Sequence, residues 1–172
     1  MKSFKDTLRR FDDNLWYFYI PVPQDIAEHF LGEEGNRRVV ATYNGSSEIQ
    51  CALFPNGNNE WFLNLSKTVR KKAKVSVGDE ITVTLKKDES EYGLPLPEEI
   101  AELWAIDDEG KRVFHLLTKG KQRSLLHIIG KPKTAETRIK KAIIVNDYLK
   151  STGGKLDYNE LKEAFKMRND EF

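Results

Sequence analysis

The sequence predicts a mainly β domain over residues 1–110, a small barrel with short helices, followed by a small helical domain over residues 111–172. Short runs of alternating apolar and polar residues, separated by turn signals, predict the strands. Apolar residues that recur every three and four positions in the last third predict the helices. The predicted strands are joined by short turns, which favours consecutive antiparallel pairing in a barrel over a parallel layered fold.

The first predicted elements lie on either side of two prolines. The first fourteen residues are polar and form a lead-in or the start of a strand, and Leu15–Ile20 is an aromatic run that predicts a buried strand. Pro21 and Pro23 are expected to end that strand, because proline has no backbone N–H for a ladder. Gln24–Leu31 follows as a short helix with one apolar stripe.

A hairpin is predicted next. Arg37–Tyr43 and Glu48–Phe54 are two extended runs on either side of Asn44-Gly45, a dipeptide that tolerates the positive φ of a tight hairpin turn. Pro55–Asn59 then forms a second turn.

The stretch from Glu60 to Leu85 is the clearest β unit. Its two ends alternate, so that Trp61, Leu63 and Leu65 share one face of a strand and Ile81, Val83 and Leu85 share one face of another. A short basic helical turn and Gly78-Asp79 connect these two strands.

An acidic segment lies between the β part and the basic tail. Asp88–Glu109 holds nine acidic residues and no Lys or Arg, and a helix is predicted from Glu98, directly after Pro97. Because the carboxylates lack the D-x-D-x-D-G pattern of a calcium loop, we expect a solvated face or a docking site for the basic tail.

Three helices are predicted in the last third. The first runs to Ile129, the second from its N-cap Thr134 to Lys150, and the third begins after Asp157. The predicted buried stripe of the second helix consists of Ile139, Ala142, Ile143, Asn146 and Leu149.

Composition favours a cytoplasmic protein. Cys51 is the one cysteine in the chain, so no internal disulfide can form, and it is expected to be a small buried apolar residue. The N-terminus has no apolar run typical of a signal peptide, and no stretch has the length of about 20 apolar residues that a membrane span needs. We therefore expect no membrane insertion.

Motifs of catalysis and cofactor binding are missing from the sequence. It has no G-x-x-x-x-G-K-[ST], G-x-G-x-x-G, H-E-x-x-H, C-x-x-C or G-x-S-x-G pattern, and its three histidines are scattered. The sequence therefore predicts no enzyme, no catalytic residue, no cofactor and no metal. One alternative is a small-molecule site in the mouth of the barrel, lined by Trp16, Trp61 or Trp104.

Two basic clusters are candidates for contacts with anions or nucleic acid. The net charge is +1, but Lys111–Lys150 holds 11 Lys or Arg against two acidic residues. The candidate residues are Lys67, Arg70, Lys71, Lys72, Lys133, Arg138, Lys140 and Lys141. Such clusters neutralise phosphates, but they also occur as solvated or internally docked faces, so the partner stays unknown, with nucleic acid or another protein as the alternatives.

The β part resembles the domain of unknown function 1905. The residues that carry this resemblance are Arg38-Val39, Tyr43-Asn44-Gly45, Leu53-Phe54-Pro55, the run Asn64–Lys71 and Val77-Gly78-Asp79. The resemblance implies a double-split β-barrel, the fold class that includes AbrB- and MazE-like transcription factors.

The tail looks like the bacteriocin-protection family, also called YdeI or OmpD-associated. Phe114–Thr118 and Glu136–Lys141 carry this resemblance, while Gly130–Lys133 departs from the usual Ala-Lys of the family. The resemblance implies a bacterial, non-catalytic binding or stress-protection module related to resistance to bacteriocins or antimicrobial peptides. The alternatives are a nucleic-acid-binding regulator of AbrB/MazE-like type and the small-molecule binder.

The regulator alternative makes a prediction about salt. If the basic clusters bind phosphates, the chain binds random-sequence DNA or RNA with micromolar affinity that falls steeply with salt, because binding releases counterions. Fluorescence anisotropy at low and moderate salt measures this affinity, and Lys71→Glu combined with Lys140→Glu should weaken it further. The absence of binding even at low salt would mean that these faces are solvated or docked within the protein.

Overall fold

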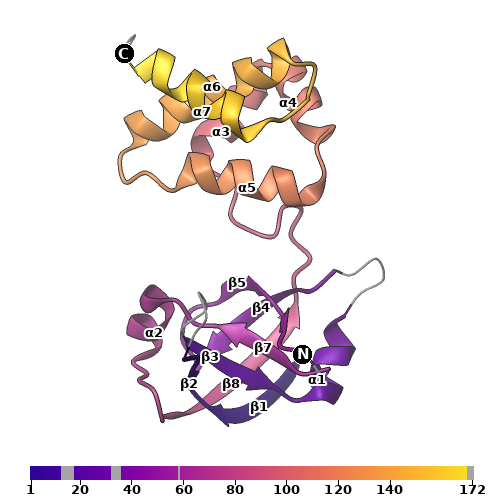
Figure 1. Ribbon diagram of the computed structural model, residues 1–172, viewed down its shortest axis with the longest axis vertical. Helices are drawn as coiled ribbons and strands as arrows, with labels where there is room; N and C mark the ends of the chain where they lie inside the picture. The colour runs from indigo at the N-terminus through magenta and orange to yellow at the C-terminus, as the bar shows by residue number, and fades with distance from the viewer. Residues whose placement is uncertain (13–17, 32–35, 58, 170–172) are drawn as a thin grey trace. The chain divides into compact units, whose positions relative to one another are not determined.

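The computed structural model describes residues 1–12, 18–31, 36–57 and 59–169, and the chain divides into two compact units, Met1–Gly93 and Leu94–Phe172 (Figure 1). The division lies at Gly93–Leu94 rather than at residue 110. The helices around Gly110 pack with the rest of the second unit, so this glycine is part of a helical core and not of a linker.

In its described residues, the first unit contains two four-stranded antiparallel sheets and two short helices. The first sheet has the order β1-β8-β4-β5 and the second has the order β2-β3-β7-β6. The strands are β1 (Lys2–Thr7), β2 (Arg9–Arg10), β3 (Phe18–Val22), β4 (Arg38–Tyr43), β5 (Ile49–Ala52), β6 (Phe54–Pro55), β7 (Trp61–Asn64) and β8 (Glu80–Lys87). The helices are α1 (Gln24–Phe30) and α2 (Lys67–Ala73).

The predicted fold class is confirmed, since a β-rich unit with short helices precedes a helical unit. Within the described residues, however, the strand ladders form two sheets and do not close into a single ring. The predicted lead-in includes a full strand, because β1 pairs with β8 along its whole length from Lys2 to Thr7.

Leu8 carries the chain from the first sheet to the second. It lies between β1 and β2, is fully buried, and donates its N–H to the carbonyl of Asp79 at 3.0 Å. Its own carbonyl accepts from the N–H of Gly78 at 2.9 Å, and Gly78 has a φ of 92° that favours glycine. The predicted Gly78-Asp79 turn therefore also holds the point at which the chain changes sheets.

The core of the first unit follows the predicted alternation. Ile81, Val83 and Leu85 of β8 are fully buried, and so are Leu63 and Leu65 of the predicted β7 face, while Trp61 is half-buried against the same core. Each strand places alternate side chains on opposite faces, so one face of each sheet enters the core and the other stays available.

Pro21 does not end β3, contrary to the prediction, because β3 continues to Val22. The carbonyl of Phe18 accepts from the N–H of Leu65, so Phe18, Ile20 and Val22 direct their backbone groups toward β7. The backbone nitrogen of Pro21 points to the other side, where β2 pairs with only Phe18 and Tyr19. The missing N–H therefore costs the ladder no bond.

The second unit contains five helices in its described residues, where the sequence predicted four, the one from Glu98 and three in the last third. They are α3 (Glu98–Ile106), α4 (Asp108–His115), α5 (Lys119–Gly130), α6 (Ala135–Ser151) and α7 (Tyr158–Asn169). The other four helices all pack against α6. The buried face of α6 is therefore broader than the predicted stripe: Ile144 and Val145 are buried, whereas Ile139 is 47% exposed.

Asp107 joins three helices of the second unit. As the N-cap of α4, its carboxylate accepts from the N–H of Gly110 at 2.8 Å. The same carboxylate accepts from the Asn146 amide at 2.8 Å and from the Lys150 ammonium at 2.5 Å, both on α6. The hydrogen bond from Lys150, followed by that from Gly110, lowers the pKa of Asp107 from 3.8 to about 2.

The acidic segment does dock the basic tail within this unit, as one of the sequence alternatives proposed. Besides the Asp107–Lys150 pair, Glu99 of α3 accepts from the guanidinium of Arg138 at 2.7 Å. The hydrogen bond from the backbone N–H of Glu99, followed by the hydrogen bond and the charge of Arg138, lowers the pKa of Glu99. These contacts are made by α3, α6 and the residue that precedes α4.

Gly110 is predicted to be intolerant of a side chain. A Cβ at this position would overlap the Asn146 amide, which is buried and held by Asp107. We expect Gly110→Ala to lower the free energy of unfolding by about 1–3 kcal/mol in a urea titration, the range typical of overpacking. Gly120→Ala is the matched control, because a Cβ on that helical glycine meets no atom within 4 Å. Equal effects of the two variants would contradict this account.

The Asp107 cap is predicted to weaken in acid. Because its pKa is lower in the folded chain, the carboxylate stabilises the fold fully above its ordinary value of 3.8 and loses this contribution as the pH falls toward about 2. Asp107→Asn should therefore be less stable than the wild type near neutral pH, with a difference that shrinks across this window. Urea unfolding of both proteins over the pH range measures this difference. If the difference in free energy of unfolding between the two proteins stays constant down to the lowest pH, the charge of Asp107 is not its cause.

Candidate functional site

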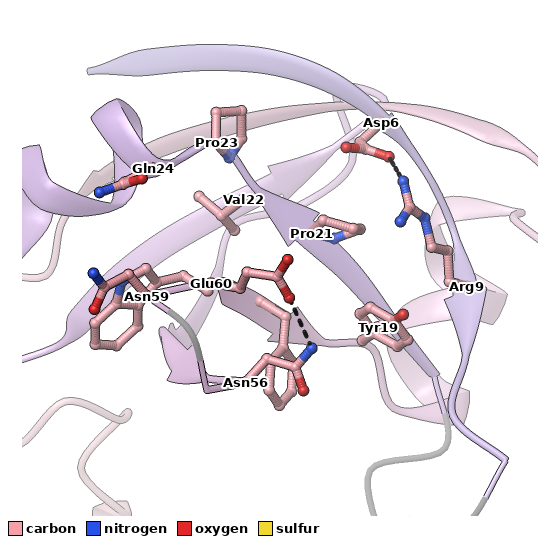
Figure 2. A pocket seen from close by; sticks show the side chains of 12 residues that line it. Asp6, Arg9, Tyr19, Pro21, Val22, Pro23, Gln24, Asn56, Asn59 and Glu60 are labelled. Atoms are coloured by element: carbon pink, nitrogen blue, oxygen red, sulfur yellow. Dashed lines mark hydrogen bonds and ion pairs between the residues drawn. The ribbon is translucent and has the colours of Figure 1, made fainter.

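The described residues of the first unit contain a hollow of about 420 Å³ beside β3 and β7 of the second sheet (Figure 2). Its apolar wall comes from β3, β7 and the start of α1. The residues of this wall are Tyr19, Pro21, Val22, Pro23, Trp61 and Phe62. Pro21 lies opposite Phe62 in the β3–β7 register, while their neighbours Ile20 and Leu63 point into the core. Both faces of the sheet therefore contribute to the wall, since Val22 and Trp61 lie on the same face as Ile20 and Leu63.

An aromatic cluster makes this wall rigid. The ring of Tyr19 stacks on Phe11 with centroids 3.7 Å apart, and both rings meet the edge or face of Phe62 at 5.3–5.7 Å. Phe54 of β6 lies against the other side of Phe62 at 5.6 Å. Phe62 is only 4% exposed although it is on the outer face of the sheet, because these rings surround it.

The rim of the hollow is polar and comes from three separate segments. Its residues are Asp6, Arg9, Gln24, Asn56, Asn59 and Glu60. The close-up in Figure 2 shows Glu60 and Asn56 side by side, with Asp6 and Arg9 along another part of the rim. No one sequence segment contains this site; it is assembled by the crossing at Leu8 and by the pairing of β3 with β7.

The turn before β7 holds the Asn56 and Glu60 side chains in place. The backbone N–H of Asn56 donates to the carbonyl of Glu60 at 2.8 Å, and the N–H of Glu60 donates to Gly57 at 2.9 Å. Gly57 and Asn59 have φ values of 82° and 61°, the left-handed region that glycine and asparagine tolerate best. The predicted turn over Pro55–Asn59 is therefore confirmed for its described residues, and it supports one side of the hollow.

Ion pairing divides the charges of the rim. Arg9 pairs with Asp6 at 3.1 Å, and Asp6 also accepts from the N–H of Thr7 at 2.7 Å. On the other side of the hollow, the carboxylate of Glu60 accepts from the Asn56 amide at 3.4 Å, a long hydrogen bond. The rim thus combines one neutralised pair with one carboxylate that is held only weakly.

The basic candidate residues in the first unit lie on α2. Lys67, Lys71 and Lys72 are exposed, and Lys67 and Lys71 share one helical face because they are four residues apart. Arg70 differs, since its guanidinium lies 3.5 Å from the ring centroid of Phe18 and is half-buried. Arg70 therefore anchors α2 on the β unit by a cation–π contact.

The basic candidates of the second unit are mostly engaged in contacts within the protein. Arg138 pairs with Glu99 and also donates to the carbonyls of Pro132 and Lys133, so its guanidinium closes the turn between α5 and α6. The ammonium of Lys140 lies 3.0 Å from Glu136, and that of Lys141 lies 5.4 Å from the ring centroid of Phe165. The side chain of Lys133 is exposed.

The three tryptophans of the small-molecule alternative have different positions. Trp61 is among the residues that line the hollow, which in the described part of the chain lies beside two strands of the second sheet and not in the mouth of a closed barrel. Trp104 is 5% exposed and packs at 4.6 Å from Phe114 in the core of the helical unit, so it does not line this site. Trp16 lies outside the described residues.

The described residues offer little for metal or covalent chemistry. No group of three or more His, Cys, Asp or Glu in this part of the chain is arranged to hold a metal ion. Burial raises the pKa of the Cys51 thiol to about 11, so the thiol stays protonated at neutral pH and is a weak nucleophile. Over the same residues, no helix combines the length and the apolar character that crossing a bilayer requires.

Sequence reasoning found Trp61 but missed most of the hollow. Asp6, Arg9, Tyr19 and Pro21 belong to no motif, and each lies near the hollow only because the two sheets fold together. A signal was present in the aromatic run next to Pro21 and in the asparagine-rich turn, both of which were interpreted only as local structure.

Two family models match the chain, one in each unit. Residues 4–85 match the domain of unknown function DUF1905, and residues 94–145 match the family described as bacteriocin-protection, YdeI or OmpD-associated. No curated protein sequence matches the chain. The second match begins at the first residue of the helical unit and includes α3 and α4. Each of the two units is therefore similar to one of these two families.

Proposed function

We propose that this protein is a non-catalytic binding module with a role in protection against bacteriocins or other antimicrobial peptides, and that its ligand binds in the hollow on the second sheet. The hollow itself is the observation that carries this proposal. It is large enough for a small molecule or for a few side chains of a peptide, and its mixed apolar and polar lining is typical of binding sites.

The chemistry of the lining supports binding rather than catalysis. None of the 12 described residues that line the hollow is His, Cys, Ser, Thr or Lys, the residue types that most often act as nucleophiles or general bases. One of the two carboxylates in the lining, Asp6, is already paired with Arg9. The protective role is supported by the family that matches the helical unit.

The rigidity of the wall also supports a preformed site. The ring of Phe11 stacks on Tyr19, both rings contact Phe62 edge to face, and the ladder between β3 and β7 holds these residues in place. A preformed wall lowers the entropic cost of binding, because few side chains have to be ordered when the ligand arrives.

A bulky residue at the rim is predicted to abolish binding. A thermal-shift screen of small molecules and short peptides should find a ligand that raises the unfolding midpoint of the first unit. At ten times its Kd, such a ligand stabilises by about 1.4 kcal/mol, or a shift of roughly 5 °C for a domain of this size. Asn56→Trp, an exposed position on the rim, should remove the shift by filling the hollow. Glu89→Trp, exposed and outside the hollow, is the matched control.

The protective role has its own readout in cells. Expression of the chain in a sensitive bacterial host should raise the bacteriocin dose that stops growth, and Asn56→Trp should lose this protection while Glu89→Trp keeps it. Turnover of a substrate that a point change abolishes would contradict the non-catalytic part of the proposal. A screen without any midpoint shift would contradict the hollow as a binding site.

The regulator alternative and the relation to the AbrB/MazE-like class stay predictions. Arg70, Arg138, Lys140 and Lys141 already make contacts within the protein. The exposed lysines on α2 and Lys133 are the candidates that the salt-dependence measurement tests.

A further inference from the structure

The charge of the hollow is unevenly distributed. Asp6 and Arg9 neutralise each other at 3.1 Å, which leaves Glu60 as the carboxylate of the lining without an ion pair among the described residues. Its one hydrogen bond there, from the Asn56 amide at 3.4 Å, is long, so the carboxylate keeps most of its capacity to accept. The lining therefore carries one uncompensated negative charge.

The aromatic walls of the hollow also favour a positively charged ligand. Tyr19, Trp61 and Phe62 contribute aromatic rings, whose faces attract cations and whose bodies accept apolar groups. One face of Tyr19 is covered by Phe11 and Phe62 is nearly buried, so a ligand meets the remaining face of Tyr19 and the half-buried Trp61. Pro21 and Pro23 add apolar surface without a backbone donor.

An anionic ligand has no matching partner in this hollow. Arg9 is the one positively charged residue among the described lining residues, and Asp6 occupies its Nη2. An anion that binds the remaining N–H groups of Arg9 would therefore face the negative charges of both Asp6 and Glu60.

We propose that the hollow binds an organic cation, an alkylguanidinium or alkylammonium group whose charged end meets the Glu60 carboxylate and whose stem lies against Tyr19, Pro21 and Trp61. This inference rests on the proposed function, which takes the hollow as the binding site. The same chemistry occurs in a free small amine and in a basic side chain of a peptide, and the experiment separates these two sources.

Isothermal titration calorimetry with the full chain tests the charge directly. N-acetyl-arginine amide represents a basic side chain of a peptide, and butylguanidinium represents a free small cation. N-acetyl-citrulline amide is the neutral isostere of the arginine compound. We expect the cations to bind and the citrulline compound to bind roughly three- to tenfold more weakly, because it lacks the charge that pairs with Glu60. Binding of the arginine amide alone identifies a peptide side chain as the ligand, and binding of butylguanidinium alone identifies a free amine or guanidine.

Glu60→Gln is the variant that isolates the carboxylate. It keeps the backbone hydrogen bonds of the turn and the size of the side chain, and it should lower the affinity for the cation roughly three- to tenfold. Glu89→Gln makes the same change of charge at an exposed residue outside the hollow, and it should leave the affinity unchanged. Circular dichroism of both variants checks that the fold is retained.

The outcomes separate this inference from the proposed function. Equal affinity for the arginine and citrulline compounds, or full affinity in Glu60→Gln, would overturn the cation assignment. If a neutral or anionic ligand shifts the unfolding midpoint and Asn56→Trp blocks it, the hollow is a binding site but not one for cations. If compounds of every charge fail to bind, both the inference and the proposed function fall.

Discussion

The pairing of β3 with β7 is the constraint on which both faces of the second sheet depend. The register sets Ile20 beside Leu63 and Pro21 beside Phe62, so one pair enters the core and the next forms part of the wall of the hollow. A slip of one residue would exchange these faces, because the side chains of a strand alternate. A slip of β3 alone would bury Pro21 in the core and expose Ile20. The apolar core therefore selects the register, and the register in turn assembles the candidate site.

Electrostatics has a different role in the two units. In the helical unit, the acidic segment and the basic tail largely neutralise each other, through Glu99 with Arg138 and Asp107 with Lys150. These pairs are partly exposed, so they contribute modestly to the free energy of unfolding, but they fix which helices meet. In the β unit, the rim of the hollow keeps the carboxylate of Glu60 without such a partner among the described residues.

Local patterns predicted the β unit better than the helical unit. The alternation at Ile81–Leu85 and the turns at Asn44-Gly45 and Gly78-Asp79 depend on neighbouring residues, and they were predicted correctly. Gly110 was misjudged because its role is a close approach to Asn146, a residue far along the chain. Ile144 and Val145 were missed because α6 is buried on more than one side, which a single-stripe pattern does not represent. Pro21 was misjudged because the sequence does not say which side of β3 lacks a partner. The hollow required the same long-range information, so only Trp61 among its residues was anticipated.

Pro21 also determines what the open side of β3 can do. Beyond Tyr19, the described part of β2 no longer pairs with β3, and a free strand edge of this kind usually recruits another strand. Pro21 offers no donor there, and its ring stands where an incoming backbone would have to approach. The edge is therefore protected against pairing with a second chain and against aggregation through strand addition. The ring of Pro21 also lines the hollow. The residue that blocks strand addition therefore still leaves the hollow accessible to a ligand that binds without pairing its backbone with β3.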